Sequence, residues 1–252
     1  MQPRDLAMAP ASIRIGCAGW ALRKESAETF PPAATHLARY AQRLDAVEIN
    51  SSFYRPHRRS TFERWAASVP AAFRFAVKMP RSVTHTARLI GVDDKLDSFL
   101  EAVSGLGTKL GPLLIQLPPS LAFDKSAAGT FFEALRHRFP GAVVCEPRHA
   151  TWFDRAPSAL LRRYEIGRVS ADPAPVPGAE EPAGYGGICY YRLHGAPRRY
   201  YSAYAGEALR RLAERMHKDA ARGLQSWCIF DNTALGAALD NALELRAMVD
   251  GA

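Results

Sequence analysis

Three charged side chains end or interrupt apolar runs of this sequence, where acid–base chemistry could use them. Glu48, Lys78 and Glu146 stand in runs that otherwise have the composition of buried strands. Burying an unpaired charge costs several kcal/mol, so a purely structural design would place apolar side chains there. A carboxylate held ionised by cations can accept a proton, and a lysine can neutralise a charged substrate. We therefore interpret the three residues as candidate catalytic groups, with the two carboxylates as general acid or base.

Further polar and aromatic residues end the same runs or follow them. Arginine and histidine suit an anionic ligand, and interleaved aromatic rings suit a ligand with a flat or ring-shaped portion. A phosphorylated sugar, a nucleotide and a single-stranded nucleic acid all have these properties. The candidate substrate-binding residues are Trp20, Asn50, Tyr54, His85, Gln116, Arg148, His149, Trp152, Asp172, Arg192, His194 and Asn232.

Eight short apolar runs must position these side chains. They alternate with longer stretches of helical period, which is typical of βαβ units and a parallel sheet. Eight strand–helix units favour a closed (β/α)8 barrel over an open doubly wound sheet, so we predict an α/β fold with a single TIM-like barrel. The predicted strands span residues 13–18, 46–50, 73–79, 112–117, 142–146, 167–171, 188–194 and 226–231, and the clearest helices span 34–44, 60–69, 128–139, 206–222 and 232–248.

Alternation along each strand predicts which side chains point into the barrel. In the second strand, Val47 and Ile49 take one face and Glu48 and Asn50 take the other. The C-terminal strand ends carry the chemistry in barrel enzymes, so polar side chains at these ends predict a site. The same parity directs Lys78, Gln116, Glu146 and Arg192 inward, and we expect Asp172, His194 and Asp231 or Asn232 at the rim.

The length of 252 residues favours one domain. We predict a flexible N-terminal extension over residues 1–11 and a single barrel domain over residues 12–252. Proline and glycine concentrate in residues 173–187. Because only two strand–helix units follow, we interpret this segment as a long loop after the sixth strand and not as a domain linker.

The composition bounds the environment of the protein. The four cysteines lie in apolar runs without a CxxC pair, so we expect reduced core thiols. The N-terminal residues lack the apolar run of a signal peptide, and no segment has the roughly 18 apolar residues of a membrane helix. We therefore expect a cytoplasmic protein without a membrane partner. A formal charge of +8 permits attraction to anions, including nucleic acid; cofactors and oligomeric state stay open.

Motifs along nearly the whole chain add a family resemblance. They are GCAGW at 16–20, VEINSSFY at 47–54, FAVKMPRSVTH at 75–85, GPLLIQLPPS at 111–120, CEPRHATW at 145–152, ADP at 171–173, YRLHG at 191–195 and FDNTALGAALDNA at 230–242. With these motifs the sequence resembles the YecE-like family, a domain of unknown function with a TIM-barrel fold. The resemblance implies the fold and the location of the polar residues. It departs at Cys17 and Ala18, where Thr-Ser is usual, at Ala171 for a Ser, and at Asp231 for an Asn.

Three functional hypotheses follow. The first is a barrel enzyme, a hydrolase, lyase or isomerase, that acts on a small anionic substrate, phosphorylated or sugar-like. The second is a nucleic-acid-binding phosphodiesterase or endonuclease-like barrel, in which His85, His149, His194, Glu146 and Asp172 could supply metal ligands. The third is a non-catalytic module that binds a metabolite or nucleotide.

Overall fold

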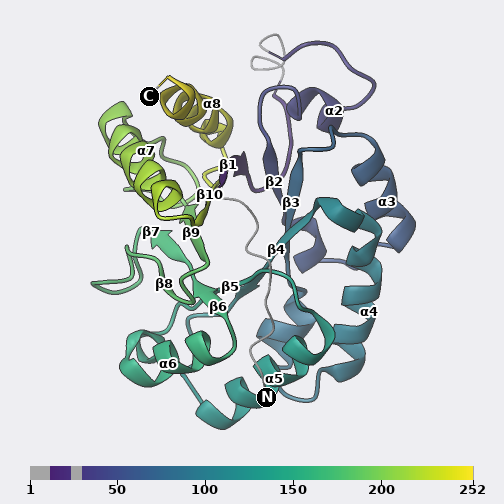
Figure 1. The fold of residues 1–252 in the computed structure, drawn as a ribbon, viewed down its shortest axis with the longest axis vertical. Coiled ribbons are helices and arrows are strands. Elements are labelled where there is room, and N and C mark those ends of the chain that lie inside the picture. The colour runs from purple at the N-terminus through teal and green to yellow at the C-terminus, as the bar shows by residue number, and fades with distance from the viewer. Residues whose placement is uncertain (1–11, 24–29, 252) are drawn as a thin grey trace.

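The structure, a computed structural model, describes residues 12–23 and 30–251 (Figure 1). The predicted N-terminal extension, residues 1–11, lies outside the described residues. The strands are β1 (Ser12–Cys17), β2 (Ala46–Ile49), β3 (Arg74–Lys78), β4 (Leu110–Gln116), β5 (Val143–Glu146), β6 (Ile166–Arg168), β7 (Ser170–Asp172), β8 (Ala183–Gly184), β9 (Ile188–Leu193) and β10 (Gln225–Phe230). The helices are α2 (His36–Tyr40), α3 (Arg59–Ala67), α4 (Asp93–Val103), α5 (Lys125–Arg138), α6 (Arg155–Arg163), α7 (Gly206–Ala221) and α8 (Ala237–Asp250).

The strands form two sheets, with the helices around their outer side (Figure 1). One sheet has the order β2-β3-β4-β5-β6-β8 and the other the order β1-β10-β9-β7. All pairs are parallel except that between β6 and the short β8. The α/β class with parallel strands is therefore confirmed.

Each of the eight predicted strands is present, with one modification. The sixth is divided at Val169 into β6, which pairs with β5, and β7, which pairs with β9. The Val169 amide still donates to Cys145 O at 2.9 Å. One continuous stretch of chain thus belongs to both sheets and joins them on this side. The segment between β7 and β9 contains the short strand β8, which the sequence analysis does not predict.

A second seam joins β1 to β2. Ala18 and Glu48 form an isolated parallel bridge, and the Gly19 amide donates to Glu48 O at 2.9 Å. Farther along, the Tyr40 hydroxyl accepts from the Cys17 amide and donates to Ala46 O, both at 2.9 Å. Gly16 permits this close approach, because a Cβ added there would lie 2.0 Å from Ala46 O.

Two apolar cores follow from the alternation of side chains. The larger core lies between the strands and the helices and includes Val47, Ile115 and Phe132. The inner core, on the opposite face of the strands, consists of Ala46, Ala76, Leu114, Val144, Val169, Ile188, Tyr190, Trp227 and Ile229. Strand parity therefore sorts the chain as the sequence predicts, and the polar side chains of the strand ends continue the inner face.

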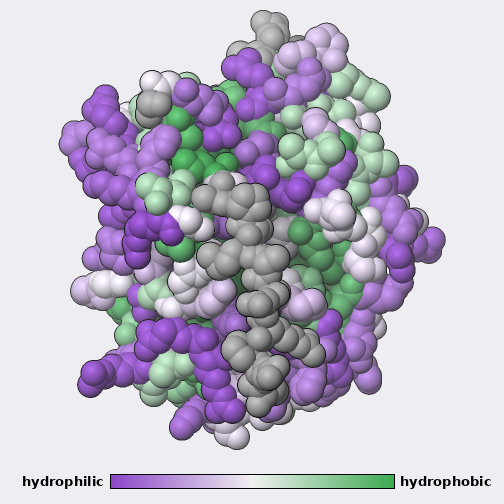
Figure 2. Space-filling view, in the orientation of Figure 1, coloured by the Kyte–Doolittle hydropathy of each residue, from purple (hydrophilic) through white to green (hydrophobic). Residues whose placement is uncertain are grey.

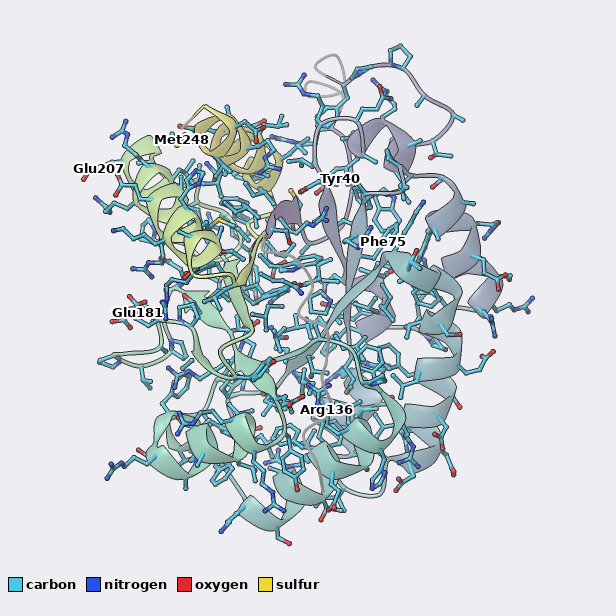
Figure 3. The ribbon with its side chains drawn as sticks, in the orientation of Figure 1. Tyr40, Phe75, Arg136, Glu181, Glu207 and Met248 are labelled. Atoms are coloured by element: carbon cyan, nitrogen blue, oxygen red, sulfur yellow. The ribbon has the colours of Figure 1, made fainter. Side chains whose placement is uncertain are left out.

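The helices present their polar faces outward, and side-chain hydrogen bonds connect them to the turns that flank the strands. Figure 2 shows hydrophilic residues gathered over the outer helices, densely along α7. Arg136 of α5, labelled in Figure 3, donates to the carbonyls of Gly141, Tyr164 and Glu165 at 2.6, 2.7 and 2.7 Å. This arginine ties the start of β5 to the turn before β6. Among the described residues, none of the helices has the length and apolar character needed to span a bilayer.

Candidate functional site

Arg192 is the centre of a buried polar layer that lies on the inner core. It comes from β9, two residues after Tyr190, and its side chain is 0% exposed. Its Nη2 and Nε atoms bind Glu48 Oε1 and Oε2 at 2.7 and 3.0 Å. Its Nη1 binds Glu146 Oε2 at 2.9 Å, and Nη2 also lies 3.1 Å from Asp231 Oδ2. One guanidinium thus holds three carboxylates from three different strand ends.

Glu146 at the end of β5 has a full set of donors. Its Oε1 accepts from Gln116 Nε2 at 3.2 Å and from Arg148 Nε at 3.0 Å, and it lies 3.1 Å from His194 Nε2. Burial alone would raise the pKa of this carboxyl. Arg192, His194 and Arg148 outweigh burial and hold the pKa well below its usual range. Glu146 is therefore an ionised anchor for its neighbours.

His194 lies between two carboxylates. Its Nδ1 is 3.0 Å from Asp231 Oδ2, and its Nε2 faces Glu146. Each ring nitrogen therefore has a carboxylate partner. Burial would raise the pKa of Asp231, but Arg192 and His194 lower it. Glu48, Glu146 and Asp231 thus all contact Arg192, and Arg148 and His194 add further contacts to this layer.

Glu48 is enclosed and cannot reach a ligand. It is 0% exposed, and besides its two contacts with Arg192 it accepts from the Tyr190 hydroxyl at 3.0 Å. Burial and the adjacent Glu48 raise the pKa of Tyr190 well above its usual value. Both oxygens of Glu48 are thus occupied. The structure places it as a buried partner of Arg192 and Tyr190.

Lys78 differs from its neighbours because it lacks a direct carboxylate partner. Among the described residues no carboxylate lies within 4.0 Å of its Nζ, which sits 4.0 Å from the centre of the Phe53 ring. Its exposed fraction is 5%. Burial first, and then Arg192, lower the pKa of Lys78 to about 8. This lysine therefore contributes a positive charge to the polar layer without a direct carboxylate contact.

His85, after β3, contacts the same ring. Its imidazole meets Phe53 edge-on with 4.9 Å between the ring centres, and Nδ1 lies 2.9 Å from Thr84 Oγ1. Burial, followed by Lys78, Arg81 and Arg148, lowers the pKa of His85 to about 4. The imidazole is thus neutral at physiological pH and able to take part in proton transfer.

A cavity of about 230 Å3 opens beside Glu146 and His194. Arg148 and Arg199 contribute cationic groups to its wall, and Glu146 and His194 contribute the edge of the polar layer. The complete lining is Pro119, Glu146, Arg148, Ala171, Pro173, Pro175, His194 and Arg199. These residues follow β4, β5, β7 and β9, so the cavity lies at the carboxyl ends of the strands.

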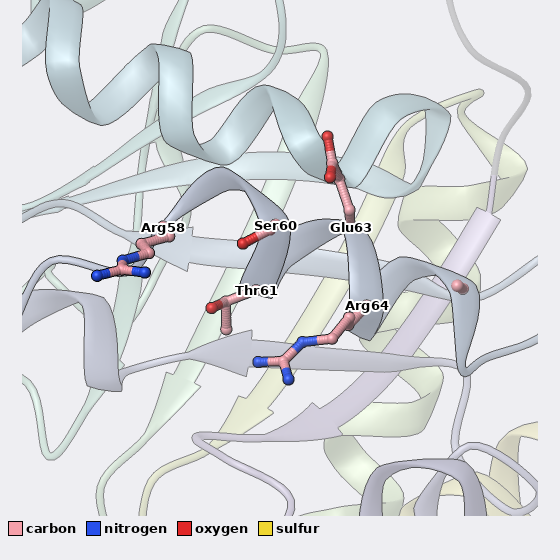
Figure 4. Close-up of a pocket in the computed structure, with 6 residues that line it drawn as sticks. Arg58, Ser60, Thr61, Glu63 and Arg64 are labelled. Atoms are coloured by element: carbon pink, nitrogen blue, oxygen red, sulfur yellow. The ribbon is translucent and has the colours of Figure 1, made fainter.

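A larger hollow of about 670 Å3 runs along the exposed side of α3 (Figure 4). It is lined from one short stretch of chain, with Arg58, Ser60, Thr61, Glu63 and Arg64 among its residues. None of the residues of the polar layer borders it. Converging groups from several strand ends are found at the smaller cavity, which we therefore take as the candidate site.

Three predicted binding residues have structural roles elsewhere. Trp152 is 1% exposed in the outer core, and its Nε1 donates to Leu121 O at 2.9 Å. Asn232 donates through Nδ2 to Ser202 O and Asn241 Oδ1 at 2.9 and 3.0 Å. Asp172 has the outward parity of Leu193, its partner in the sheet, and accepts from the Tyr204 hydroxyl at 3.1 Å.

The remaining predicted binding residues differ in their contacts and in their exposure to solvent. Trp20 packs edge-on against Trp65 with 5.1 Å between the ring centres, and His149 caps a short 3-10 helix, Ala150–Phe153, through Thr151. Tyr54 is 74% exposed after β2. Asn50 has a buried Oδ1 without a hydrogen-bond partner among the described residues. Gln116, Arg148, Arg192 and His194 are gathered around Glu146 as described above.

The five residues considered as metal ligands do not come together. Only His194 and Glu146 of that set are in contact, and Asp172 points to the opposite face of the sheet. Among the described residues, no group of three or more histidine, cysteine, aspartate or glutamate side chains has a geometry suited to a metal ion.

Three contributing residues stand outside the list of candidate binding residues, although Asp231 is one of two alternatives expected at the rim. Asp231 completes the ionic layer, Tyr190 binds Glu48, and Arg199 lines the cavity. Tyr190 shares the inward parity of Arg192, and Asp231 that of Ile229, so strand alternation held the signal for both. Arg199 lies in an irregular loop, where no periodicity indicates direction.

Comparison with known proteins places the chain among relatives without a described activity. The family model described as "Protein of unknown function DUF72" matches residues 14–252. UPF0759 protein YecE of Escherichia coli strain K12 is 29% identical over 148 residues, which are 56% of this chain and 54% of YecE. UPF0759 protein YunF of Bacillus subtilis is 28% identical over 152 residues, 56% of this chain and 52% of YunF. The match thus spans about half the length of these curated relatives.

Two solved structures share the fold over almost the whole chain. A DUF72 family protein of Enterococcus faecalis aligns with a TM-score of 0.79 at 20% identity, covering 95% of this chain and 96% of that one. A DUF72 family protein of Thermotoga maritima aligns with a TM-score of 0.77 at 24% identity, covering 94% and 99%. The YecE-like resemblance of the sequence is therefore confirmed.

Proposed function

Since this chain belongs to the DUF72 family of proteins of unknown function, we propose its function from the site. The protein binds and converts a small anionic molecule, phosphorylated or sugar-like, at the carboxyl ends of its strands. The two sheets form one closed (β/α)8 barrel around the inner core. The shared sixth strand and the β1–β2 seam support this closure, since they join the sheets on both sides.

The observation that carries the proposal is the pair of arginines in the wall of the cavity, Arg148 and Arg199. Arg148 also contacts Glu146, whereas Arg199 has no carboxylate partner within 4.0 Å among the described residues. Arginine presents several donors to phosphate or carboxylate oxygens. An anion in the cavity would pair with both guanidinium groups.

The size of the cavity favours a small ligand. About 230 Å3 is below the usual range for drug-sized molecules. A bound anion at Arg148 would lie against the Glu146–His194 pair. Lys78, whose pKa is lowered to about 8, can exchange a proton near neutral pH. We therefore assign anion binding to Arg148 and Arg199, and proton transfer to Lys78 in preference to Glu48.

Titration calorimetry with inorganic phosphate and glucose 6-phosphate tests this proposal. Arg148→Met and Arg199→Met should each weaken binding about ten-fold or more, since each removes a charge-assisted hydrogen bond. Arg162→Met, which replaces an exposed arginine of α6, is the matched control and should leave affinity unchanged. Equal affinities in all four proteins, or no binding to the wild type, would contradict the proposal. A turnover assay on a ligand so found separates an enzyme from a non-catalytic binding module.

A second candidate function, single-stranded nucleic-acid binding, has its own observation. The large hydrophobic residues that are exposed in the described chain all follow strand ends: Tyr54, Ile90, Tyr200, Tyr201 and Leu235. The loops at 50–58, 79–92 and 194–205 contain six arginines and no aspartate or glutamate. Exposed rings among arginines provide stacking surfaces and phosphate contacts.

Fluorescence anisotropy with a labelled oligothymidylate tests this candidate. Binding should weaken steeply between about 50 and 200 mM salt, and Tyr54→Ala should weaken it further. Binding that is absent, or that ignores salt, would exclude the oligonucleotide as a ligand of this face.

A further inference from the structure

Lys78 is the feature of the site that anion binding alone does not explain. The chain has six lysines, and besides Lys78 the buried lysine and arginine side chains among the described residues are Arg168 and Arg192. Arginine is always charged and matches carboxylates in two contacts, whereas lysine can lose its proton and act as a nucleophile. If the layer needed only a permanent positive charge, an arginine would supply it. A lysine at position 78 adds an amine that can lose its proton.

The surroundings of Lys78 favour a reactive amine. Its Nζ lies over the apolar Phe53 ring at 4.0 Å, without a carboxylate within 4.0 Å among the described residues. By contrast, Lys109 Nζ donates to the carbonyls of Ala66 and Val69, both at 2.6 Å. A pKa of about 8 leaves roughly a tenth of Lys78 as the neutral amine at pH 7. Desolvation beside other cations is a recognised route to a nucleophilic lysine.

Two neighbours can serve a ligand that reacts at this amine. The register of β2 and β3 pairs Ile49 with Val77, so continuing it by one residue places Asn50 beside Lys78 on the inner face. The buried Oδ1 of Asn50 has no partner among the described residues and could accept from a ligand hydroxyl. His85 shares the Phe53 ring with Lys78 and is neutral, so it adds no further positive charge beside the amine.

We propose that Lys78 is a Schiff-base nucleophile for a small anionic aldehyde or ketone. The inference rests on the proposed anion site and adds the substrate class. The neutral amine attacks the carbonyl carbon, and a proton moves from the amine nitrogen to the carbonyl oxygen. Loss of that oxygen as water, with a further proton, leaves an iminium ion that joins Nζ to the substrate carbon. The overall balance is amine plus carbonyl plus one proton to iminium plus water.

Reductive trapping tests the inference directly. The whole protein is incubated with dihydroxyacetone phosphate or pyruvate and sodium cyanoborohydride, and the reduced adduct is located by peptide mass mapping. Modification concentrated on Lys78 supports the inference. Modification confined to other lysines, or none with either probe, overturns it. Mapping on the wild type needs no variant and so does not depend on how a substitution folds.

Two variants separate this inference from the anion site. Lys78→Arg keeps the charge but removes the nucleophile, so trapping should be lost, whereas phosphate should still bind in calorimetry because its contacts are assigned to Arg148 and Arg199. Lys125→Arg, at the exposed start of α5, should trap like the wild type at Lys78. Phosphate binding without trapping would overturn the Schiff base and leave the proposed function standing. Trapping at Lys78 that Arg148→Met does not weaken would remove the anion site and keep the nucleophile.

Discussion

Arg192 and Glu48 face each other in a two-contact ion pair, at 2.7 and 3.0 Å, with neither side chain exposed to solvent. Such a pair is costly to desolvate and still more costly to break, because one charge is left buried alone. Arg192 also holds Glu146 and Asp231. The pair therefore organises the floor of the candidate site and does not itself contact a ligand.

Glu48→Gln should lower the free energy of unfolding by about 3 kcal/mol, since it removes one charge of an enclosed pair. Denaturant unfolding monitored by circular dichroism measures the change. Glu207→Gln is the control, because Glu207 pairs with Arg211 on the exposed face of α7. That control should change stability by less than about 0.5 kcal/mol. An equal, small effect of both substitutions would contradict the structural role of Glu48.

Acid should destabilise the protein through Glu146. Its pKa in the folded state lies well below the usual value, so the unfolded chain takes up a proton first as pH falls. The stabilisation is complete above the unfolded pKa of about 4.3, and it is lost as pH falls from there through the lowered folded pKa. Unfolding free energies measured from neutral to acidic pH should fall more steeply for the wild type than for Glu146→Gln. Parallel curves would show that Glu146 is not held ionised by its neighbours.

Trp152 should behave as a core residue and not as a ligand contact. Trp152→Phe removes the hydrogen bond to Leu121 O and part of a buried ring, and it should cost about 1–3 kcal/mol of stability. Phosphate affinity, measured by calorimetry on the folded variant, should stay at the wild-type value. A loss of affinity with unchanged stability would restore the ligand-binding role that the sequence suggests.

Gly16 should not tolerate a side chain. An alanine Cβ there would lie 2.0 Å from Ala46 O, so Gly16→Ala must push β1 away from β2, at about 3 kcal/mol. Gly129→Ala in α5 is the matched control. Its new Cβ meets only Leu160 Cδ1, at 4.0 Å, and alanine in a helix should add about 0.5–1 kcal/mol. Thermal unfolding of the two variants should therefore shift in opposite directions.

Strand parity is the part of the site that could be predicted from the sequence. Glu48, Gln116, Glu146 and Arg192 were directed inward by period-two alternation, and they converge because parallel strands end at one edge. Asp172 lies on the outer face, because its expected place at the rim was taken from the strand end without regard to its parity. Val169 faces the inner core, so Asp172, three residues later, faces outward.

The role of a residue could not be predicted in this way where it depends on which neighbouring side chains contact it. Glu48 and Glu146 have the same residue type and equivalent positions, yet only Glu146 borders the cavity. The difference arises from the reach of Arg192 and Tyr190, which converge on Glu48 from β9. Similarly, Trp152 stands in a motif rich in polar residues, but the direction of its ring is decided by the packing of Phe123 and Phe132.

The seam at Tyr40 has a consequence for how the protein is made. β1 shares a continuous ladder only with β10, whereas its seam with β2 consists of one bridge, the Gly19 amide bond to Glu48 O and the Tyr40 hydroxyl. β1 therefore leaves the ribosome well before β10, and its backbone stays largely unpaired until β10 is made. During synthesis, the apolar face of β1 needs shelter until then, and an interrupted chain would expose it.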